Sequence, residues 1–465
     1  MKANLHLSMN PLLTRRSFVA GSLLFPGIVQ QLMAASDSPL DPLAPRAPHF
    51  PAKAKRVIFI FLSGGMSHVD TFNYRPRLIA DAGKPFGEKK GGSLFLKPPG
   101  WEFTPRGKCG MMMSSIFPQL GKVADDLCLI NSMVTDAPDH TAMTFMMHTG
   151  SANVARPSIG SWVSYGLGTE NKNLPSFVVI APEIPYHGAE NWGAEFLPGA
   201  HQGTRIIPGD EPIPNLSRRL PSGKLQNLEL EKIASLNQRH LRGREADPQL
   251  AARIRSFETA AGMQMEAPEA LDVEKESDST LSSYGIERGG KKGFAWQALA
   301  ARRLIERGVR FVEVIDKGAS LGANWDHHGD MKRHEGNARD VDQPIAALIQ
   351  DLKERGLFDD TLVVITTEFG RTPAVVKPDH KGREHHSKCF SSFLAGAGVQ
   401  RGLTYGLSDD YGIEVAENKV HVHDFHSTIL HLLGFDHHRL TYRHAGLDFK
   451  LTGVNECSVV KGVLA

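Results

Sequence analysis

The stretch that decides the fold is RVIFIFLSGG, residues 56–65. Six apolar side chains follow one another from Val57 to Leu62 without alternation, and two glycines come directly after Ser63. Runs of this kind are typical of strands buried on both faces, as in parallel sheets. We therefore expect residues 56–62 to form a central strand of a mostly parallel sheet.

Further short apolar runs alternate along the chain with longer segments of helical periodicity. The expected strands are residues 127–131, 177–180, 310–315, 361–366 and 390–395, and the expected helices are residues 294–307, 341–355 and 424–433. Strands that alternate with helices of this length predict an α/β fold, with a mostly parallel central sheet and helices on both faces. Residues 206–290 are rich in charged residues and Gln and have little strand character, so we expect a helical insertion there.

The first 35 residues have the pattern of a signal peptide. Arg15 and Arg16 precede an uncharged, mostly apolar run over residues 19–35, as in leaders read by the twin-arginine export machinery. The run is short and interrupted for a membrane span, and the alternative is an ordinary N-terminal helix. We expect export to the periplasm or the cell exterior, with residues 36–55 as an exposed linker and residues 56–465 as the folded domain.

The composition limits the class of function. Lys and Arg number 53 against 51 Asp and Glu in 465 residues, and the net charge is +2. This balance excludes a dedicated nucleic-acid binder, which concentrates positive charge on one face. The 21 histidines, many of them beside acids, instead favour a metal-binding protein or one that acts on phosphate groups.

Acids and imidazoles stand where several of the expected strands end. They are Asp70 after the first strand, Asp316, Asp326, His327 and His328 after the strand at 310–315, Glu368 and Arg371 after the strand at 361–366, and His385 and His386 ahead of the strand at 390–395. In open parallel sheets, ligands bind outside the carboxyl ends of the strands. Nitrogen and carboxylate ligands brought to one edge predict a site for a divalent metal, with Zn, Ca and Mg as candidates. The alternative for each residue alone is a solvated loop position.

The order of these motifs resembles the alkaline-phosphatase and sulfatase superfamily. Within it, the chain is similar to the usually exported bacterial group catalogued as domain of unknown function 1501. The motifs that carry this resemblance are FLSGGMSHVDTF, MMHTG, RPSIGSWVSYGLG, NWDHHGD, DDTLVVITTEFGRTP, GREHHSKCFSSFLAGAG and DFHSTILHLLG, within residues 56–450. The resemblance implies an exported, metal-dependent hydrolase of sulfate or phosphate esters, with a small molecule or a glycan as the substrate.

The resemblance also implies metal ligands. Asp326 and His328 are similar to an Asp and a His that hold one metal in related phosphodiesterases, with a longer spacing there, so that His327 is an alternative ligand. His385 is similar to a metal-binding His ahead of a strand, and Glu368 takes the place of a ligand Asp.

The chain departs from the pattern of a two-metal site at two positions. Phe369 stands where a ligand His is expected, and Ser63-Gly64-Gly65 stands where an acid follows the first strand. Asp70 is the candidate to replace that acid. These departures keep open a catalytically silent protein on the same fold that binds an anion or a sulfated glycan.

The sulfatase nucleophile motif ends in Thr-Gly ten residues after its nucleophile, and counting back from Thr149-Gly150 gives His140. Either His140 is itself the reactive or ligating group, or the adjacent Thr141 supplies the attacking hydroxyl. The alternative is a core helix with His140 as its polar start. For the anion, we expect contacts from Arg371 and from the backbone of Gly64 and Gly65.

Overall fold

The structure is a computed structural model that describes residues 41–465, apart from residues 90–91, 217–221, 245–246 and 321. The expected signal peptide, with Arg15 and Arg16, lies outside the described residues. No helix within the described part of the chain combines the length and the apolar character that crossing a membrane requires.

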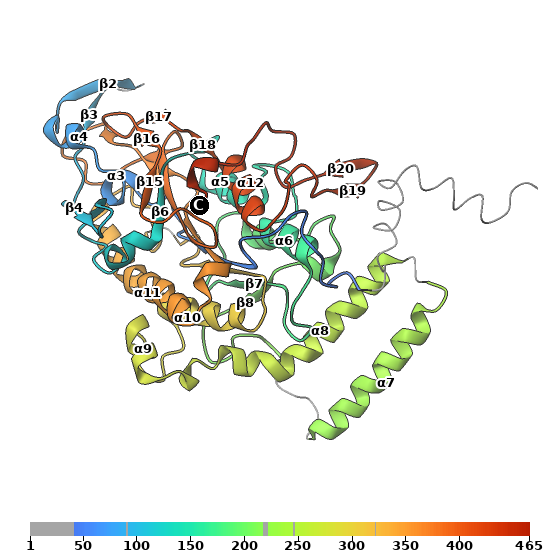
Figure 1. The fold of residues 1–465 in the computed structure, drawn as a ribbon. Helices are drawn as coiled ribbons and strands as arrows, with labels where there is room; N and C mark the ends of the chain where they lie inside the picture. The colour runs from blue at the N-terminus through green and yellow to red at the C-terminus, as the bar shows by residue number, and fades with distance from the viewer. Residues whose placement is uncertain (1–40, 90–91, 217–221, 245–246, 321) are drawn as a thin grey trace, which may run out of the picture.

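The core of the molecule is a nine-stranded sheet, shown in Figure 1. Its strands are β1 (Arg56–Phe61), β6 (Leu127–Val134), β7 (Phe177–Ile180), β8 (Thr204–Ile206), β9 (Phe311–Ile315), β10 (Thr361–Thr366), β14 (Phe390–Gly396), β15 (Leu403–Tyr405) and β18 (Val420–His421). The order is β15-β6-β14-β10-β1-β9-β7-β8, and β18 also pairs with β6. Within this sheet β14 is antiparallel to both of its neighbours, and the other pairs are parallel. The predicted α/β fold with a mostly parallel sheet is confirmed.

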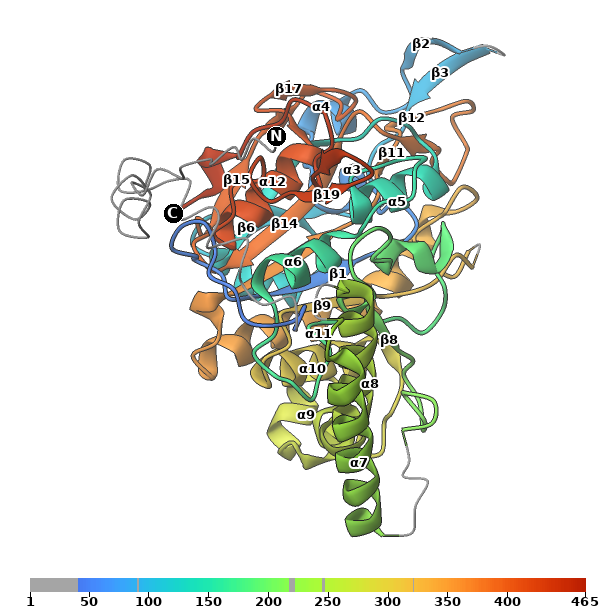
Figure 2. The same cartoon turned by 90° about the vertical axis from the view of Figure 1, so that its right-hand side faces the viewer.

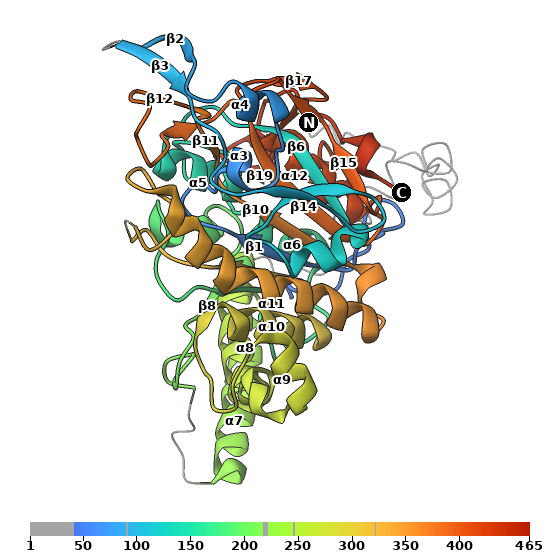
Figure 3. The same cartoon turned by 90° about the vertical axis from the view of Figure 1, so that its left-hand side faces the viewer.

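Helices cover both faces, because the side chains of β1 alternate between two apolar cores. The helices are α3 (His68–Thr71), α4 (Pro76–Ala80), α5 (His140–Thr149), α6 (Ile159–Leu167), α7 (Gly223–Leu241), α8 (Pro248–Leu271), α9 (Asp278–Tyr284), α10 (Gly293–Glu306), α11 (His334–Glu354) and α12 (Val422–Leu432). Ile58 and Ile60 pack in the core with α10 and α11. Val57 and Phe59 pack in the core with α5, α6 and α12. Figures 2 and 3 show these two groups of helices on opposite sides of the sheet.

The region expected as a helical insertion, residues 206–290, holds α7, α8 and α9. Helices α7 and α8 extend away from the sheet, as Figure 2 shows. Smaller sheets pair β2 (Pro85–Lys89), β3 (Gly92–Leu96) and β12 (Ala374–Val375), β4 (Phe103–Arg106) with β5 (Met111–Ser114), β11 (Gly370–Arg371) with β13 (His385–His386), β16 (Leu407–Ser408) with β17 (Val415–Glu417), and β19 (Tyr442–His444) with β20 (Leu447–Phe449).

The described part of the expected linker, residues 41–55, is exposed at residues 45–47, 51–53 and 55 and contacts the folded domain at other positions. Leu43 and Ala54 are buried, and the backbone amides of Lys53 and Ala54 donate to the carbonyl of Leu432. Backbone hydrogen bonds therefore join the end of this stretch to the end of α12.

Candidate metal centre

Four strands bring the predicted ligands to one edge of the sheet. The carboxyl ends of β1, β9 and β10 lie together because these strands are parallel and in register. The antiparallel direction of β14 places its amino end at the same edge, with His385 just before it. The short pairing of β13 with β11 sets His385 opposite Arg371.

Asp326 lies at the centre of the site. Its Oδ1 atom is 3.0 Å from Nε2 of His328 and 3.3 Å from Nε2 of both His140 and His385. The same oxygen accepts a hydrogen bond of 2.7 Å from the Arg371 guanidinium. Three imidazole nitrogens and one cationic side chain therefore converge on a single carboxylate oxygen.

His328 and His385 can present lone pairs to this point. The Nδ1 of His385 lies 2.9 Å from the carbonyl of Pro138, and the Nδ1 of His328 lies 3.0 Å from a Glu384 carboxylate oxygen. With a metal ion at this point, each ring would keep its proton on Nδ1, toward the carbonyl or the carboxylate, and turn the lone pair of Nε2 to the ion. Without an ion, the two Nε2 atoms lie 2.9 Å apart, within hydrogen-bond distance, so that one of them donates to the other. Metal-binding histidines have the former arrangement, with the outer nitrogen donating to a protein oxygen.

His140 is the first residue of α5, where the side chain of Asp139 caps the helix by accepting from the Ala142 amide. Its Nδ1 lies 2.5 Å from Oε1 of Glu368, and its Nε2 lies 3.3 Å from Oδ1 of Asp326. That Nε2 is buried, and its contact with Asp326 is an ion pair without the geometry of a hydrogen bond. A buried nitrogen of this kind is one that a metal ion would satisfy.

Glu368 lies behind His140. Besides His140, its carboxylate accepts hydrogen bonds from the amide of Gly64, at 2.9 and 3.2 Å, and from the hydroxyl of Thr367, at 2.9 Å. Glu368 is therefore placed to orient the imidazole of His140, and its described contacts do not include Asp326.

The donor set fits a divalent metal. The ligand atoms of His140, Asp326 and His385 all lie within 4.8 Å of one another, and His328 contacts two of these three residues. Zinc takes four nitrogen and oxygen ligands at about 2.0–2.2 Å, and imidazole also suits other transition metals. His140, Asp326 and His385 at this spacing can close around one such ion, with His328 beside two of them.

The charges at the site hold the acids ionised. Burial raises the pKa of Asp326, but the contacts from His140, His385 and Arg371 outweigh it and hold the pKa well below the usual range. Burial also raises the pKa of Glu368, and the hydrogen bond and charge of His140 bring it below its ordinary value. For His140 itself, burial lowers the pKa, and the two carboxylates raise it above 6.5.

Arg371 is fully buried, and the five N–H groups of its guanidinium face protein atoms. It donates to the carbonyls of Gly64, Gly65 and Arg383 and to Asp326, and its Nη1 lies 3.4 Å from Nε2 of His328. The anion contact predicted for Arg371 would therefore require it to leave one of these partners. The amide of Gly64, which was predicted to donate to the anion, likewise donates to Glu368.

The two glycines after β1 are required by close packing. Both have positive φ, +112° for Gly64 and +69° for Gly65. A Cβ on Gly64 would lie 2.7 Å from the backbone of Asp326, and one on Gly65 would lie 2.7 Å from the ring of Phe369. Larger residues would push the metal-binding loop away from the end of β1.

Besides Glu368, the predicted site residues Asp70 and Thr141 have no described contact with Asp326. The buried carboxylate of Asp70 pairs with Arg383 at 2.6 Å and accepts from the Ser67 hydroxyl and the Gly100 amide. Burial raises the pKa of Asp70, but Arg383 holds it below its ordinary value. Thr141 is exposed next to His140, and within the described residues its hydroxyl has no hydrogen-bond partner.

Sequence reasoning missed several partners of the site. Tyr186 stacks on the ring of His140, with 4.4 Å between centroids, and Glu384 and Pro138 fix two of the imidazoles. Tyr186 and Pro138 lie in loops away from the predicted strand ends, so nothing in their local pattern marks them. Glu384 stands beside His385, and this acid next to a predicted ligand is a signal that could have found it.

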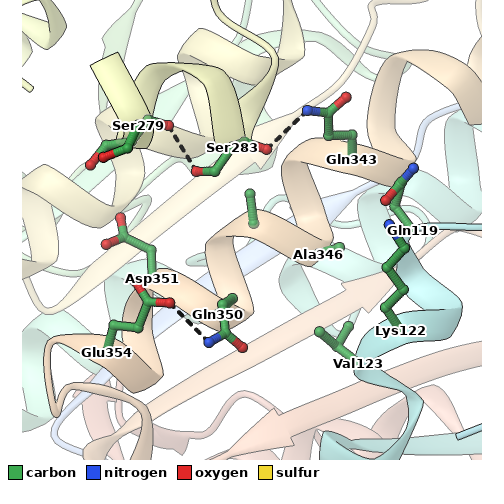
Figure 4. A pocket seen from close by; sticks show the side chains of 12 residues that line it. Gln119, Lys122, Val123, Ser279, Ser283, Gln343, Ala346, Gln350, Asp351 and Glu354 are labelled. Atoms are coloured by element: carbon green, nitrogen blue, oxygen red, sulfur yellow. Dashed lines mark hydrogen bonds between the residues drawn. The ribbon is translucent and has the colours of Figure 1, made fainter. Parts of the chain in front are cut away.

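A separate hollow of about 540 Å³ lies between α9 and α11, shown in Figure 4. Ser279, Ser283, Gln343, Gln350 and Asp351 are among the residues that line it. Its lining includes no imidazole or thiol, so it does not offer the ligand set found around Asp326.

Comparison with protein families gives a match over most of the chain. A family model with the description "Protein of unknown function (DUF1501)" matches residues 54–464. No curated protein matches the chain.

Solved structures are similar at low identity. Lipoteichoic acid synthase LtaP from Listeria monocytogenes is 11% identical over 85% of this chain and 76% of that chain, with a TM-score of 0.38. The PsFucS1 sulfatase from Pseudoalteromonas sp. is 12% identical over 82% and 68%, with a TM-score of 0.34. Phosphonate monoester hydrolase SpPMH from Silicibacter pomeroyi is 12% identical over 82% and 74%, with a TM-score of 0.35. Structural similarity at these TM-scores does not support a conclusion about the site of this chain. The match over residues 54–464 does decide the family, and the chain belongs to the family described as protein of unknown function DUF1501.

Proposed function

We propose that this protein is an exported metal-dependent hydrolase of a sulfate or phosphate ester, carried by a small molecule or a glycan. One observation carries the proposal: the Nε2 atoms of three histidines converge on one carboxylate oxygen of Asp326. His140, His328, His385 and Asp326 would hold a divalent metal, with zinc favoured by the three nitrogens. A metal bound there polarises an ester oxygen and activates the attacking group.

The residues around the ligands have roles that follow from their contacts. Glu368 accepts the Nδ1 proton of His140 and so keeps the Nε2 lone pair directed toward Asp326. The positive charge of Arg371 keeps Asp326 ionised, as a ligand carboxylate must be. Thr141 is the candidate nucleophile, because its hydroxyl is exposed beside His140. His140 then acts as a ligand through Nε2, because its Nδ1 is held by Glu368.

A second candidate function rests on a different observation. The ring of Phe369 packs against His140 and His385 with 4.7 Å between centroids in each pair, and Asp70 is paired with Arg383. A second metal would therefore find neither a ligand at position 369 nor a free acid after β1. This favours, as the alternative, a catalytically silent protein that binds an anion or a sulfated glycan.

Hydrolysis of an aryl sulfate and an aryl phosphate by the purified protein separates the two functions. We expect turnover of one ester class that is lost on chelation and restored by Zn, Ca or Mg. His385→Ala should lose activity, whereas His240→Ala, on the exposed helix α7, should retain it. Bound metal without turnover of either ester contradicts the hydrolase and supports the binding protein.

We also propose that the twin-arginine machinery exports the chain, on the evidence of Arg15 and Arg16. Replacing both residues by Lys should leave the precursor in the cytoplasm, measured by fractionation. Unchanged export of that variant contradicts the proposal.

A further inference from the structure

Asp316 is a buried acid directly after β9, and it has no described contact with the ligands around Asp326. Its Oδ1 accepts hydrogen bonds from the backbone amides of Ser63, at 2.9 Å, and of Lys317, at 2.7 Å. Its Oδ2 accepts from the indole N–H of Trp325, at 2.7 Å. Both carboxylate oxygens are therefore occupied by N–H donors of the protein.

These hydrogen bonds join the two segments that meet at the metal centre. Ser63 begins the turn after β1, and Trp325 directly precedes Asp326. The two segments are also bonded to each other, because the backbone N–H of Trp325 donates to the carbonyl of Ser63, at 3.0 Å. Trp325 is fully buried and is thus held through both its backbone and its side chain.

The two segments pack closely at the next residue of the turn. A Cβ on Gly64 would lie 2.7 Å from the backbone nitrogens of both Trp325 and Asp326. The carbonyl of Gly64 accepts from the guanidinium of Arg371, which also donates to Asp326. A shift of Trp325 or of the turn therefore displaces the carboxylate of Asp326 from the histidines. Binding sites require their side chains to be placed within about 0.5 Å.

We propose that Asp316 is a positioning residue of the metal centre, which places the carboxylate of Asp326 through its hydrogen bonds to Ser63 and Trp325. The proposal rests on the metal centre of the proposed function. It gives Asp316 a role other than that of a metal ligand, which an acid at a strand end would suggest, because both of its oxygens already accept from the protein.

Asp316→Asn tests the role of the carboxylate. The amide oxygen of Asn can still accept from the two backbone amides, but its NH₂ group then faces the indole N–H of Trp325, so that two donors oppose each other. We expect the affinity for Zn²⁺ to fall by about 10–100-fold, the range for residues that orient metal ligands. Competition with a chelator measures it above pH 8, because burial raises the pKa of Asp316 to about 7.

The double variant Asp316→Asn/Trp325→Phe tests whether the two side chains act together. Phe keeps a buried aromatic ring but removes the N–H group that the Asn side chain opposes. We expect the double variant to bind Zn²⁺ more tightly than Asp316→Asn does, so that the two substitutions are not additive. A double variant that binds no more tightly than Asp316→Asn overturns the proposal.

Asp342→Asn is the matched control for a general loss of stability. Asp342 is a buried acid on α11 that accepts from the backbone amides of Gln119 and Leu120, and none of its described contacts is with a metal ligand. This variant should be less stable than the wild type and should keep its affinity for Zn²⁺. Loss of Zn²⁺ affinity in Asp342→Asn equal to that in Asp316→Asn overturns the proposal.

The visible absorption of the Co²⁺-loaded protein reports the geometry of the ligands in folded molecules, so a change in stability alone does not alter it. We expect Asp316→Asn to shift the bands of bound Co²⁺ and Asp342→Asn to leave them unchanged. Wild-type bands and wild-type Zn²⁺ affinity in Asp316→Asn overturn the proposal. Loss of metal as complete as in Asp326→Ala, without recovery in the double variant, also overturns it and makes Asp316 a ligand.

The outcomes separate this proposal from the proposed function. A wild type whose Zn²⁺ affinity depends on Asp316 but which cleaves neither ester class leaves the proposal standing and contradicts only the hydrolase. A wild type that cleaves an ester with bound metal, and whose metal affinity does not depend on Asp316, contradicts only this proposal. A wild type that binds neither Zn²⁺ nor Co²⁺ overturns the metal centre and this proposal with it.

Discussion

Oε1 of Glu368, the acid that follows β10, lies 2.5 Å from Nδ1 of His140. Glu368 therefore contacts an imidazole of the site, and its described contacts do not include Asp326. The sequence places Glu368 among the metal ligands. In the structure its carboxylate instead contacts Nδ1 of His140 and can orient that ring, as acids commonly do for metal-binding histidines.

Glu368→Gln tests this position. The amide oxygen of Gln can still accept from Nδ1 of His140, but the charge is gone. We expect metal affinity to fall by about 10–100-fold, the range for partners of metal ligands. Competition with a chelator of known affinity measures it, and Glu368→Asp is the variant that keeps the charge. Loss of metal as complete as in Asp326→Ala contradicts the position and makes Glu368 a direct ligand.

A pair of substitutions distinguishes the role of His140 from that of Thr141. His140→Ala should lose metal and activity together, because a ligand is removed. Thr141→Ala should keep its metal and lose turnover, because the attacking hydroxyl is removed. Metal content and hydrolysis of the better aryl ester are measured on the same samples. Full activity in Thr141→Ala shows that another group attacks, and normal metal content in His140→Ala contradicts its role as a ligand.

A second imidazole of α5 makes stability depend on pH. His148 Nε2 lies 2.6 Å from Oε1 of Glu313 on β9, and both side chains are buried. Burial lowers the pKa of His148, but Glu313 outweighs it and raises the pKa above 6.5. Because the folded state binds the proton more tightly, the pair stabilises fully below pH 6.5, and its contribution is lost as pH rises through the folded-state pKa.

Chemical denaturation at several pH values measures this effect. The free energy of unfolding of the wild type should fall as pH rises above 6.5, and the double variant His148→Gln/Glu313→Gln should lose that part of the slope. His148→Gln alone should destabilise by about 3–5 kcal/mol, because it leaves a buried unpaired carboxylate. Equal slopes in the wild type and the double variant would show that the pair does not hold a proton.

The fold follows from local patterns in the sequence, and so does the position of the candidate ligands at one edge of the sheet. Continuous apolar runs mark buried strands, and the polar residues at their ends include Asp326, His328 and His385. This works because parallel strands end at one edge of the sheet, so a local pattern implies a shared location.

Contacts between distant segments do not follow in this way. The pairing of Asp70 with Arg383 joins residues 313 positions apart, and the acceptor of the His385 proton is a backbone carbonyl at Pro138. The guanidinium of Arg371 similarly donates hydrogen bonds to backbone carbonyls of the turn after β1. The partner of a buried charged side chain depends on how distant segments pack together. A single sequence does not show that packing.

The most direct test of the metal centre is the position of the ion in crystals of the protein, located by anomalous scattering at the absorption edge of the metal found in solution. We predict one ion, within about 2.0–2.2 Å of Nε2 of His140, Nε2 of His385 and an oxygen of Asp326. An ion bound elsewhere, or a crystal of metal-loaded protein in which these three side chains remain in contact with one another and with no ion, would contradict the account.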